Sequence, residues 1–298
     1  MATLKALKIR IGSVSSSEKI TGAMKMISSA KVHKSEQALR RLTPYQRQIR
    51  SIMAHILATD TEFNSVLIQS RDVKRVCVVV YGTDDGLCGA YNINIFKHLL
   101  VELNSLRERY GSDVEIELLP VGRKLHKPCQ HLQNARLKVS IPEGVDSKME
   151  GRAVDAFTHR LREGFTDGSY DLVEVVHMQY FSMSRQRPKV EQLFPVTEEA
   201  IQGPMSERKM EQDNKLYIFE PDANTIFNEV LPMFVLSTMQ EVTIQNQASE
   251  QAARVMAMQS ANDNAKKLLD ELQLEYNKLR QQSITTELLD IIGGQVKR

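Results

Sequence analysis

The sequence contains few of the residues that mark disulfide-bonded, metal-binding and loop-rich proteins. Among its 298 residues there are three cysteines, Cys77, Cys88 and Cys129, and they form no CxxC pair. This excludes a disulfide framework and the common type of zinc site, so we expect all three to be reduced and Cys77 to lie buried in a strand. Glycine is scarce, with 14 residues, and tryptophan is absent, whereas there are 13 methionines. This balance indicates a largely helical chain with adaptable apolar contacts.

Long apolar runs are also missing. No stretch approaches the roughly 20 consecutive apolar residues that a membrane-spanning helix needs. Residues 1–8 lack the apolar segment of a signal peptide and the Arg- and Ser-rich character of an organelle presequence, so we expect a cytoplasmic location. A hydrophobic content of 42% and a charged content of 26% are close to globular averages, which excludes a disordered chain.

Sequence motifs for catalysis or metal binding are absent. The seven histidines show no HExxH or similar ligand spacing, and no Gly-x-Ser-x-Gly sequence occurs. Residues 82–92, GTDDGLCGAYN, follow a predicted strand and precede a predicted helix, where a phosphate-binding loop would lie. A P-loop needs Lys and then Ser or Thr after its last glycine, but Ala90 and Tyr91 stand there, and Asp84 and Asp85 would repel phosphate. We therefore predict a structural turn, with no catalytic, cofactor or metal site in the chain.

Basic residues are concentrated near the N-terminus, although the net charge of the chain is only +2. Residues 1–50 contain eleven Lys or Arg and two Glu, which gives this segment a net charge of +9. Such a segment favours an acidic partner, and a solvated helix face is the alternative interpretation. No aromatic residue interleaves the basic ones before Tyr45 and no recognition motif occurs, so we predict no nucleic-acid partner.

Both ends of the chain have the pattern of long helices. Residues 233–292 contain neither Gly nor Pro, and one helix of this length would span about 90 Å. Ala261, Ala265, Leu268 and Leu272 recur at steps of four, three and four, which is close to the period of a coiled coil. Residues 1 to about 60 carry a similar apolar stripe and can continue as a helix past Pro44 with a kink.

These two helices are natural partners for one another. Helices at opposite ends of one chain, joined through a domain at one end of the pair, would lie antiparallel. The small side chains of Ala248 and Ala252 would let the other backbone approach closely, and we expect Ala252 to face the region near Met26. The sequence thus predicts an antiparallel two-helix coiled coil.

The middle of the chain alternates strand and helix patterns. Residues 75–81, RVCVVVY, form a continuous β-branched run of the type found in buried parallel strands. Serial strand and helix signals predict a mostly parallel sheet with helices on its faces and a late hairpin at its edge, a Rossmann-like α/β domain. The further predicted strands are 115–121, 172–182, 189–194 and 215–219, and the predicted helices are 94–110 and 148–163. We expect three parts: helix 1–62, α/β domain 63–222 and helix 223–298.

Four segments resemble the γ subunits of F-type ATP synthases more closely than periodicity explains. Near the N-terminus the match is residues 19–31, KITGAMKMISSAK, and in the middle it is the loop at 82–92. The C-terminal helix matches at residues 248–258, ASEQAARVMAM, with ANDNA at 261–265 and YNKLRQ at 276–281. Residues 284–294, ITTELLDIIGG, resemble the terminal signature of the family. The resemblance covers essentially the whole chain, in the right order, and is of the bacterial type.

The resemblance implies a rotor shaft without an active site of its own. It implies that the helix pair enters the hexamer of α and β subunits, and that the α/β domain lies near the ε subunit and the membrane c-ring at the cytoplasmic face of the bacterial plasma membrane. Ion flow through the ring would turn the shaft and drive ATP synthesis at the β subunits, with no small-molecule substrate on this chain. The alternative from another class is a nucleotide-dependent α/β enzyme with a helical dimerisation arm.

The same resemblance implies a set of partner contacts. An apolar tip would turn in an apolar sleeve of the hexamer, with a frayed helix end as the alternative. Polar residues of the C-terminal helix would contact β-subunit loops, and basic residues of the N-terminal helix would meet acidic β-subunit segments. Met24 matches an interface methionine of the family, with ordinary packing as the alternative. The predicted contacts are Met24, Lys25, Lys31, Arg254, Arg280, Gln281, Thr285, Glu287, Leu288, Leu289, Ile291 and Ile292.

Overall fold

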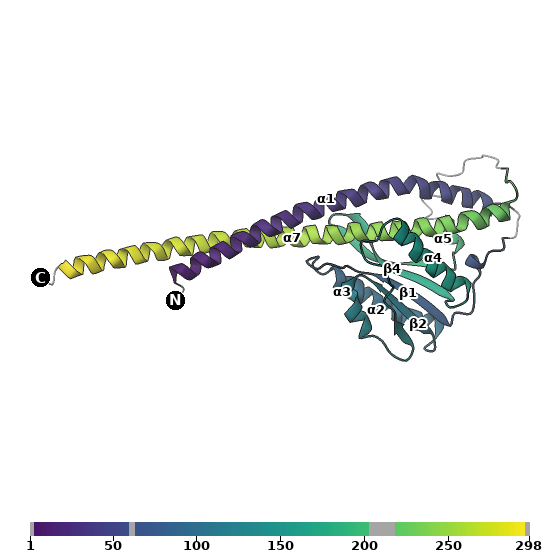
Figure 1. Cartoon of the computed structure of the whole chain (residues 1–298), viewed down its shortest axis with the longest axis horizontal. Helices are drawn as coiled ribbons and strands as arrows, with labels where there is room; N and C mark the ends of the chain where they lie inside the picture. Colours follow the sequence, from purple (N-terminus) through teal and green to yellow (C-terminus); the bar gives the residue numbers. More distant parts are fainter. Residues whose placement is uncertain (1–2, 60–62, 203–217, 296–298) are drawn as a thin grey trace.

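Two long helices form a rod with an α/β domain at one end (Figure 1). The computed structural model describes residues 3–59, 63–202 and 218–295. Helix α1 (Leu4–Leu57) has 54 residues and α7 (Ala223–Gln295) has 73. The Thr3 hydroxyl caps α1 by accepting a hydrogen bond of 3.3 Å from the amide of Ala6. Each helix contains one proline in its interior and continues past it, as predicted for the first helix.

The two helices pair in antiparallel register, as predicted. Near the domain, the Gln46 amide donates to Glu241 of α7 at 2.7 Å, and further along, Asn262 donates to the Glu18 carbonyl at 2.7 Å. Between these points Val32 packs against Ala252, which is fully buried. The register differs from the expected one, because Met26 is 69% exposed and Val32 takes the place opposite Ala252.

The α/β domain is built on one five-stranded sheet with the order β3-β2-β1-β4-β5. Neighbouring strands are parallel except for β4 and β5, which form an antiparallel hairpin at one edge. The predicted sheet type and edge hairpin are therefore confirmed. The strands are β1 (Arg75–Tyr81), β2 (Glu115–Val121), β3 (Leu137–Val139), β4 (Leu172–Ser182) and β5 (Arg185–Phe194).

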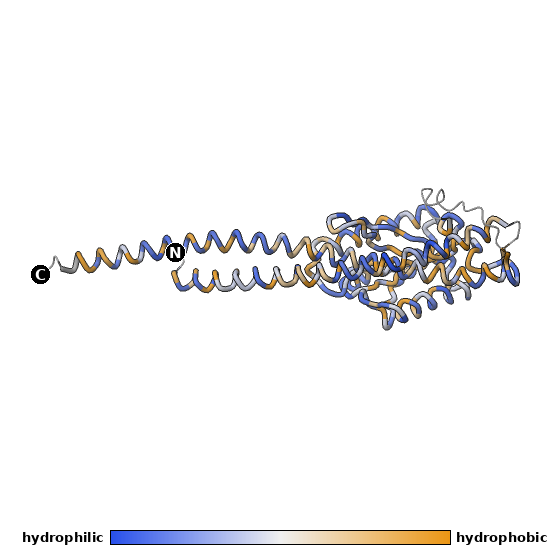
Figure 2. The backbone as a smooth tube through the Cα atoms, turned by 90° about the horizontal axis from the view of Figure 1, so that it is seen from above, coloured by the Kyte–Doolittle hydropathy of each residue, from blue (hydrophilic) through white to orange (hydrophobic). Residues whose placement is uncertain are grey.

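Each face of the sheet buries an apolar core. Alternate residues of β1 divide between the faces: Val76, Val78 and Val80 pack under α2, whereas Cys77 and Val79 face α4 and the helix pair. Figures 1 and 2 show the rod running beside the sheet and then away from it. The other helices within the described residues are α2 (Tyr91–Tyr110), α3 (Arg123–Gln130), α4 (Arg152–Thr166), α5 (Glu198–Gln202) and the 3-10 turn η1 (Val66–Ile68).

Several predicted boundaries need correction. Helix α2 begins three residues earlier than expected, α4 begins four residues later, and β5 begins four residues earlier. Neither α3 nor β3 was predicted. Of the predicted strand at 215–219, residues 215–217 lie outside the described residues, and Ile218 and Phe219 do not form a strand. All three cysteines are free, and Cys77 is buried in β1 as predicted; Cys88 and Cys129 are buried as well.

Candidate interaction surfaces

The C-terminal end of α7 projects beyond the start of α1 as a single helix (Figure 2). Leu272 is still buried, with 3% exposure, but Leu289 is 63% exposed and Ile292 is 59% exposed. Ile284, Leu288 and Ile291 recur at steps of four and three, so they form one exposed apolar stripe. A contiguous exposed apolar patch of this kind marks an interaction site.

The polar residues predicted to contact a partner lie on this same projecting segment. Arg280, Gln281, Thr285 and Glu287 are all exposed. The Thr285 hydroxyl donates to the carbonyl of Gln281 at 2.9 Å. No ion pair of Arg280 or Glu287 is found among the residues that the structure describes. The structure therefore brings eight of the twelve predicted contact residues together at the tip of the rod.

Three further predicted residues lie on α1, much nearer the domain. Met24 and Lys25 are half-buried beside α7, whereas Lys31 is exposed. Neither lysine forms an ion pair with any residue that the structure describes. Thr21, just before these residues in α1, contacts Asn262 of α7. Residues 262 and 280 are about 27 Å apart at 1.5 Å per residue, so these α1 residues and the tip are separate surfaces.

Arg254, the remaining predicted contact residue, makes contacts within its own chain. Its side chain is only 7% exposed and faces the α/β domain of its own chain. The guanidinium donates to Glu250 at 2.7 Å and to the carbonyls of Gly86 at 3.2 Å and Asp85 at 3.4 Å. Sequence periodicity missed this because it does not show which face of a long helix turns toward the sheet.

The loop that this arginine holds is a structural turn. Burial alone would raise the pKa of Asp84, but hydrogen bonds from the Arg123 amide and from Ser147 outweigh it and lower the pKa. Gly122 has φ of +100°, and a Cβ at this position would lie 2.8 Å from the amide nitrogen of Thr83. The Asp84 carboxylate is thus hydrogen-bonded within the chain, and the backbone of Gly122 lies close against Thr83.

Helix α7 fills the crevice where an α/β protein of this type would bind a nucleotide. Ligands of open α/β sheets lie outside the carboxyl ends of the strands. Here the Asn246 side chain accepts from the Tyr91 hydroxyl at 2.5 Å and donates to the Gly82 carbonyl at 3.3 Å. Ser249 donates to the carbonyl of Met178 in β4 at 3.0 Å. Sequence periodicity does not predict these contacts, because Asn246 and Ser249 look like ordinary polar helix residues.

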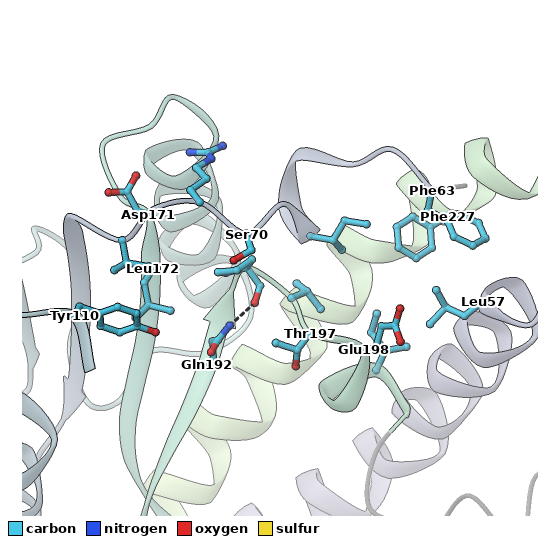
Figure 3. Close-up of a pocket in the computed structure, with 16 residues that line it drawn as sticks. Leu57, Phe63, Ser70, Tyr110, Asp171, Leu172, Gln192, Thr197, Glu198 and Phe227 are labelled. Carbon is cyan, nitrogen blue, oxygen red and sulfur yellow. Dashed lines mark hydrogen bonds between the residues drawn. The ribbon is translucent and has the colours of Figure 1, made fainter. Parts of the chain in front are cut away.

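A cleft of about 480 Å³ lies at the opposite edge of the sheet, near the base of the rod (Figure 3). Leu57, Phe63 and Phe227 line one end of it, and Asp171 lies at the other. The Asp171 carboxylate accepts from the amides of residues 74 and 75, and Gln192 donates to the carbonyl of residue 195 at 2.8 Å. These polar groups are bonded within the chain, so they offer little to orient a ligand.

Metal and membrane features are absent from the part of the chain that the structure describes. No group of three or more His, Cys, Asp or Glu side chains there is arranged to hold a metal ion. None of the helices over the same residues combines the length and apolar character needed to cross a membrane.

Known proteins share both the sequence and the fold. The sequence model of the ATP synthase family matches residues 3–296. The ATP synthase gamma chain of Bacteroides thetaiotaomicron is 36% identical over 302 residues, with all of both chains covered at 100%. The gamma chain of Phocaeicola vulgatus is 38% identical and covers 99% of this chain and 100% of its own, and that of Cupriavidus pinatubonensis is 35% identical with 99% of each covered.

Two solved structures of the Euglena gracilis mitochondrial ATP synthase contain chains of the same fold. One, the OSCP/F1/c-ring assembly in rotational state 3, gives a TM-score of 0.63 at 19% identity and covers 98% of this chain and 93% of that chain. The other is the rotor in rotational state 1. It gives a TM-score of 0.62 at 17% identity and covers 94% of this chain and 98% of that chain. These structures show that the fold is shared. Because the family model and the relatives above match the sequence over its full length, the chain belongs to the ATP synthase gamma-chain family.

Proposed function

We propose that this chain is the central rotor shaft of a bacterial F-type ATP synthase. The observation that carries the proposal, within this family, is α7: one helix of 73 residues that docks on the α/β domain and ends in a free apolar tip. A helix with this shape links two distant places mechanically. Non-directional apolar contacts at the tip would let it turn in a surrounding sleeve without breaking fixed bonds.

The mechanism follows from the asymmetry of the rod. Toward its tip the shaft is one helix, and further down it is two, so rotation presents a different face to each surrounding subunit. ATP chemistry takes place on the β subunits, where these contacts open and close the catalytic sites and gate product release. The chain itself contributes positioning and torque, and it makes or breaks no covalent bond.

The proposed partners are the α and β subunits around the rod, and the ε subunit and c-ring around the α/β domain. We place the complex at the cytoplasmic face of the bacterial plasma membrane, with this chain as a peripheral component that couples ion transport to ATP synthesis. The division into parts 1–62, 63–222 and 223–298 follows these two tasks. The outer parts form the shaft, and the middle part is the foot that the ring turns.

Charge and exposure support the proposed contacts. Lys31 and Arg280 are exposed cations without described ion-pair partners, and they lie at two heights on the rod. Acidic loops of β subunits would pair with them at particular rotation angles, and these pairs would be weak enough at an exposed surface to exchange during a turn. Leu288 and Ile292 supply the apolar contact at the tip.

Purification of the complex through a tag on this chain tests the proposed function. We expect membranes to yield this chain together with two larger nucleotide-binding subunits and with ATP-driven ion pumping. Recovery of this chain alone, with nucleotide bound to its α/β domain, would instead support the enzyme with a helical arm. The filled crevice beside Asn246 argues against that outcome.

A further inference from the structure

Helix α7 holds the α/β domain through a continuous polar seam. Over three turns, from Thr243 to Arg254, each turn of the helix places at least one side chain in a hydrogen bond with the carboxyl edge of the sheet or with the loops that follow it. Thr243 contacts the Tyr81 hydroxyl at 3.0 Å, and the amide of Gln247 donates to the Met149 carbonyl at 3.1 Å. Asn246 and Ser249 add the contacts to β1 and β4 described above.

The charged centre of the seam is the pair Glu250 and Arg254. Their side chains are 3% and 7% exposed, and 2.7 Å separates the Arg254 Nη2 atom from the Glu250 Oε1 atom. Burial raises the pKa of Glu250, and Arg254 opposes this. Both residues lie on α7, so their pair does not itself cross to the domain. It holds the Arg254 guanidinium in place, and the hydrogen bonds of that guanidinium to the Gly86 and Asp85 carbonyls resist rotation of the helix relative to the loop.

Helix α1 has weaker polar ties to the same domain. Among the described residues, Lys34 pairs with Glu150 at 3.3 Å, but both side chains are largely exposed, at 75% and 68%. The Tyr180 hydroxyl donates to Glu36 at 2.6 Å. Near its end α1 adds Ile49, Met53 and Ile56 to the apolar core of the domain, and further along the cluster of Val32 packs against Tyr180 and Met183. Apolar contacts carry little directional preference.

We propose that the seam of α7 is the joint that transmits torque between the α/β domain and the shaft, with Glu250 and Arg254 as its positioning residues. The inference rests on the proposed rotor function and assigns the mechanical load to α7 rather than α1. A softer joint would let the foot turn without turning the tip by the same angle. Coupling would then fall while the catalytic sites, which lie on other chains, kept their chemistry.

The test uses the assembled ATP synthase in membrane vesicles with Glu250→Gln or Arg254→Lys. Both substitutions keep the side-chain size nearly constant but weaken the charged pair. Glu271→Gln is the matched control, because Glu271 lies exposed on the same helix outside the seam. Tyr180→Phe is the control for the α1 side, because it removes the hydrogen bond to Glu36.

Two readouts separate a joint from a general structural role. One is the ratio of ions pumped to ATP hydrolysed, and the other is the angular fluctuation of a bead attached to the foot while the hexamer is held still. For both seam variants we expect a pumping ratio at least about threefold lower and an angular fluctuation about twofold wider, with unchanged ATP hydrolysis. Both control variants should match the wild type.

A reversible crosslink between the loop and α7 tests whether a stiffened joint restores pumping. A Cβ on Gly89 of the loop would lie 3.7 Å from the Cβ of Ala257 on α7, which is the usual separation in a disulfide. In the Glu250→Gln background, oxidation of the pair Gly89→Cys and Ala257→Cys should narrow the fluctuation and restore pumping, and reduction should reverse both. Gly89→Cys alone controls for the strained backbone at φ of +60°.

The outcomes distinguish the joint from the rotor function. Seam variants that assemble with wild-type stiffness and pumping would overturn the joint and leave the rotor function intact. A variant that fails to assemble even when crosslinked would also count against a joint, because it would show that the seam serves folding. A wild-type complex in which the foot does not turn relative to the hexamer would overturn the rotor function itself.

Discussion

His177 is the residue with the clearest pH dependence in the α/β domain. It is buried in β4, and neither ring nitrogen has a hydrogen-bond partner among the described residues. Burial lowers the pKa of His177 from 6.5 to about 3, and the charge of Lys189 on the neighbouring strand adds to the effect. Folding therefore favours the neutral ring. The resulting stability is complete above pH 6.5 and is lost as the pH falls toward 3.

Replacing His177 with Leu should remove this dependence. Between about pH 7.5 and about pH 5, we expect the unfolding free energy of the wild type to fall by about 2 kcal/mol more than that of His177→Leu. Denaturant unfolding of the purified complex or chain at both pH values measures the difference. The exposed His159, replaced by Gln, is the control and should follow the wild type. Equal pH slopes for the wild type and His177→Leu would show that the ring is protonated in the folded protein.

Gly122 tests the tight packing of the loop against the start of α3. Gly122→Ala should lower the free energy of unfolding by more than Gly111→Ala does, although both glycines have positive φ, +100° and +92°. At Gly111 a Cβ has open space, so only the backbone strain of about 1–2 kcal/mol applies. At Gly122 the contact with Thr83 adds a further penalty of about 1–3 kcal/mol. Thermal unfolding compares the two variants, and equal melting temperatures would contradict the close approach.

Leu289 tests the apolar tip. Leu289→Asp should lower ATP synthesis in vesicles by about tenfold or more, because the proposed sleeve would bury an unpaired carboxylate. Gln273→Asp is the control, since Gln273 is exposed on α7 below the tip. Normal yield of the complex together with normal synthesis in Leu289→Asp would be inconsistent with an apolar sleeve.

At the scale of elements, sequence patterns were most informative where they were long. The breaker-free run predicted α7, and the β-branched run predicted β1 with its bounds, because burial on both faces leaves a continuous apolar signal. Helix α3 was missed because its eight residues contain four basic or histidine side chains and Pro128, and β3 was missed because it has three residues. The hairpin at the edge of the sheet extends further than its apolar residues indicate.

The candidate site was predictable to a similar degree. The apolar tip at the end of a long helix can be recognised in the sequence, and the structure leaves that tip exposed. The seam was not predictable, because Asn246, Ser249 and Glu250 are polar residues that periodicity assigns to a solvated face. Their burial depends on where the sheet lies against α7, which only the tertiary structure defines.

The pairing of α1 and α7 can be tested by crosslinking within one chain. Cysteines at Thr21 and Asn262 should react with a short bifunctional maleimide, because the Thr21 Oγ1 and Asn262 Nδ2 atoms are 3.3 Å apart. Cysteines at Met26 and Ala252 are the matched control and should react poorly, because Met26 points outward. Gel mobility and peptide mapping identify the product. Efficient reaction of the control pair and none of the test pair would show a different register.

At the scale of the whole molecule, the chain joins a domain of ordinary α/β type to a rod that extends far beyond it (Figure 1). The positive charge of the first 50 residues lies along this rod rather than on the domain. Such a distribution places the directional and electrostatic contacts along the shaft and the apolar contact at its end. A molecule of this form is suited to carry motion between two partners.

The most direct measurement is rotation of the foot. A bead attached to the α/β domain of this chain, in a complex whose hexamer is fixed to a surface, should turn continuously in one direction when ATP is added. Rotation should stop when ATP is removed. A bead that stays at a fixed angle while the same complexes hydrolyse ATP at the normal rate would contradict a rotating shaft.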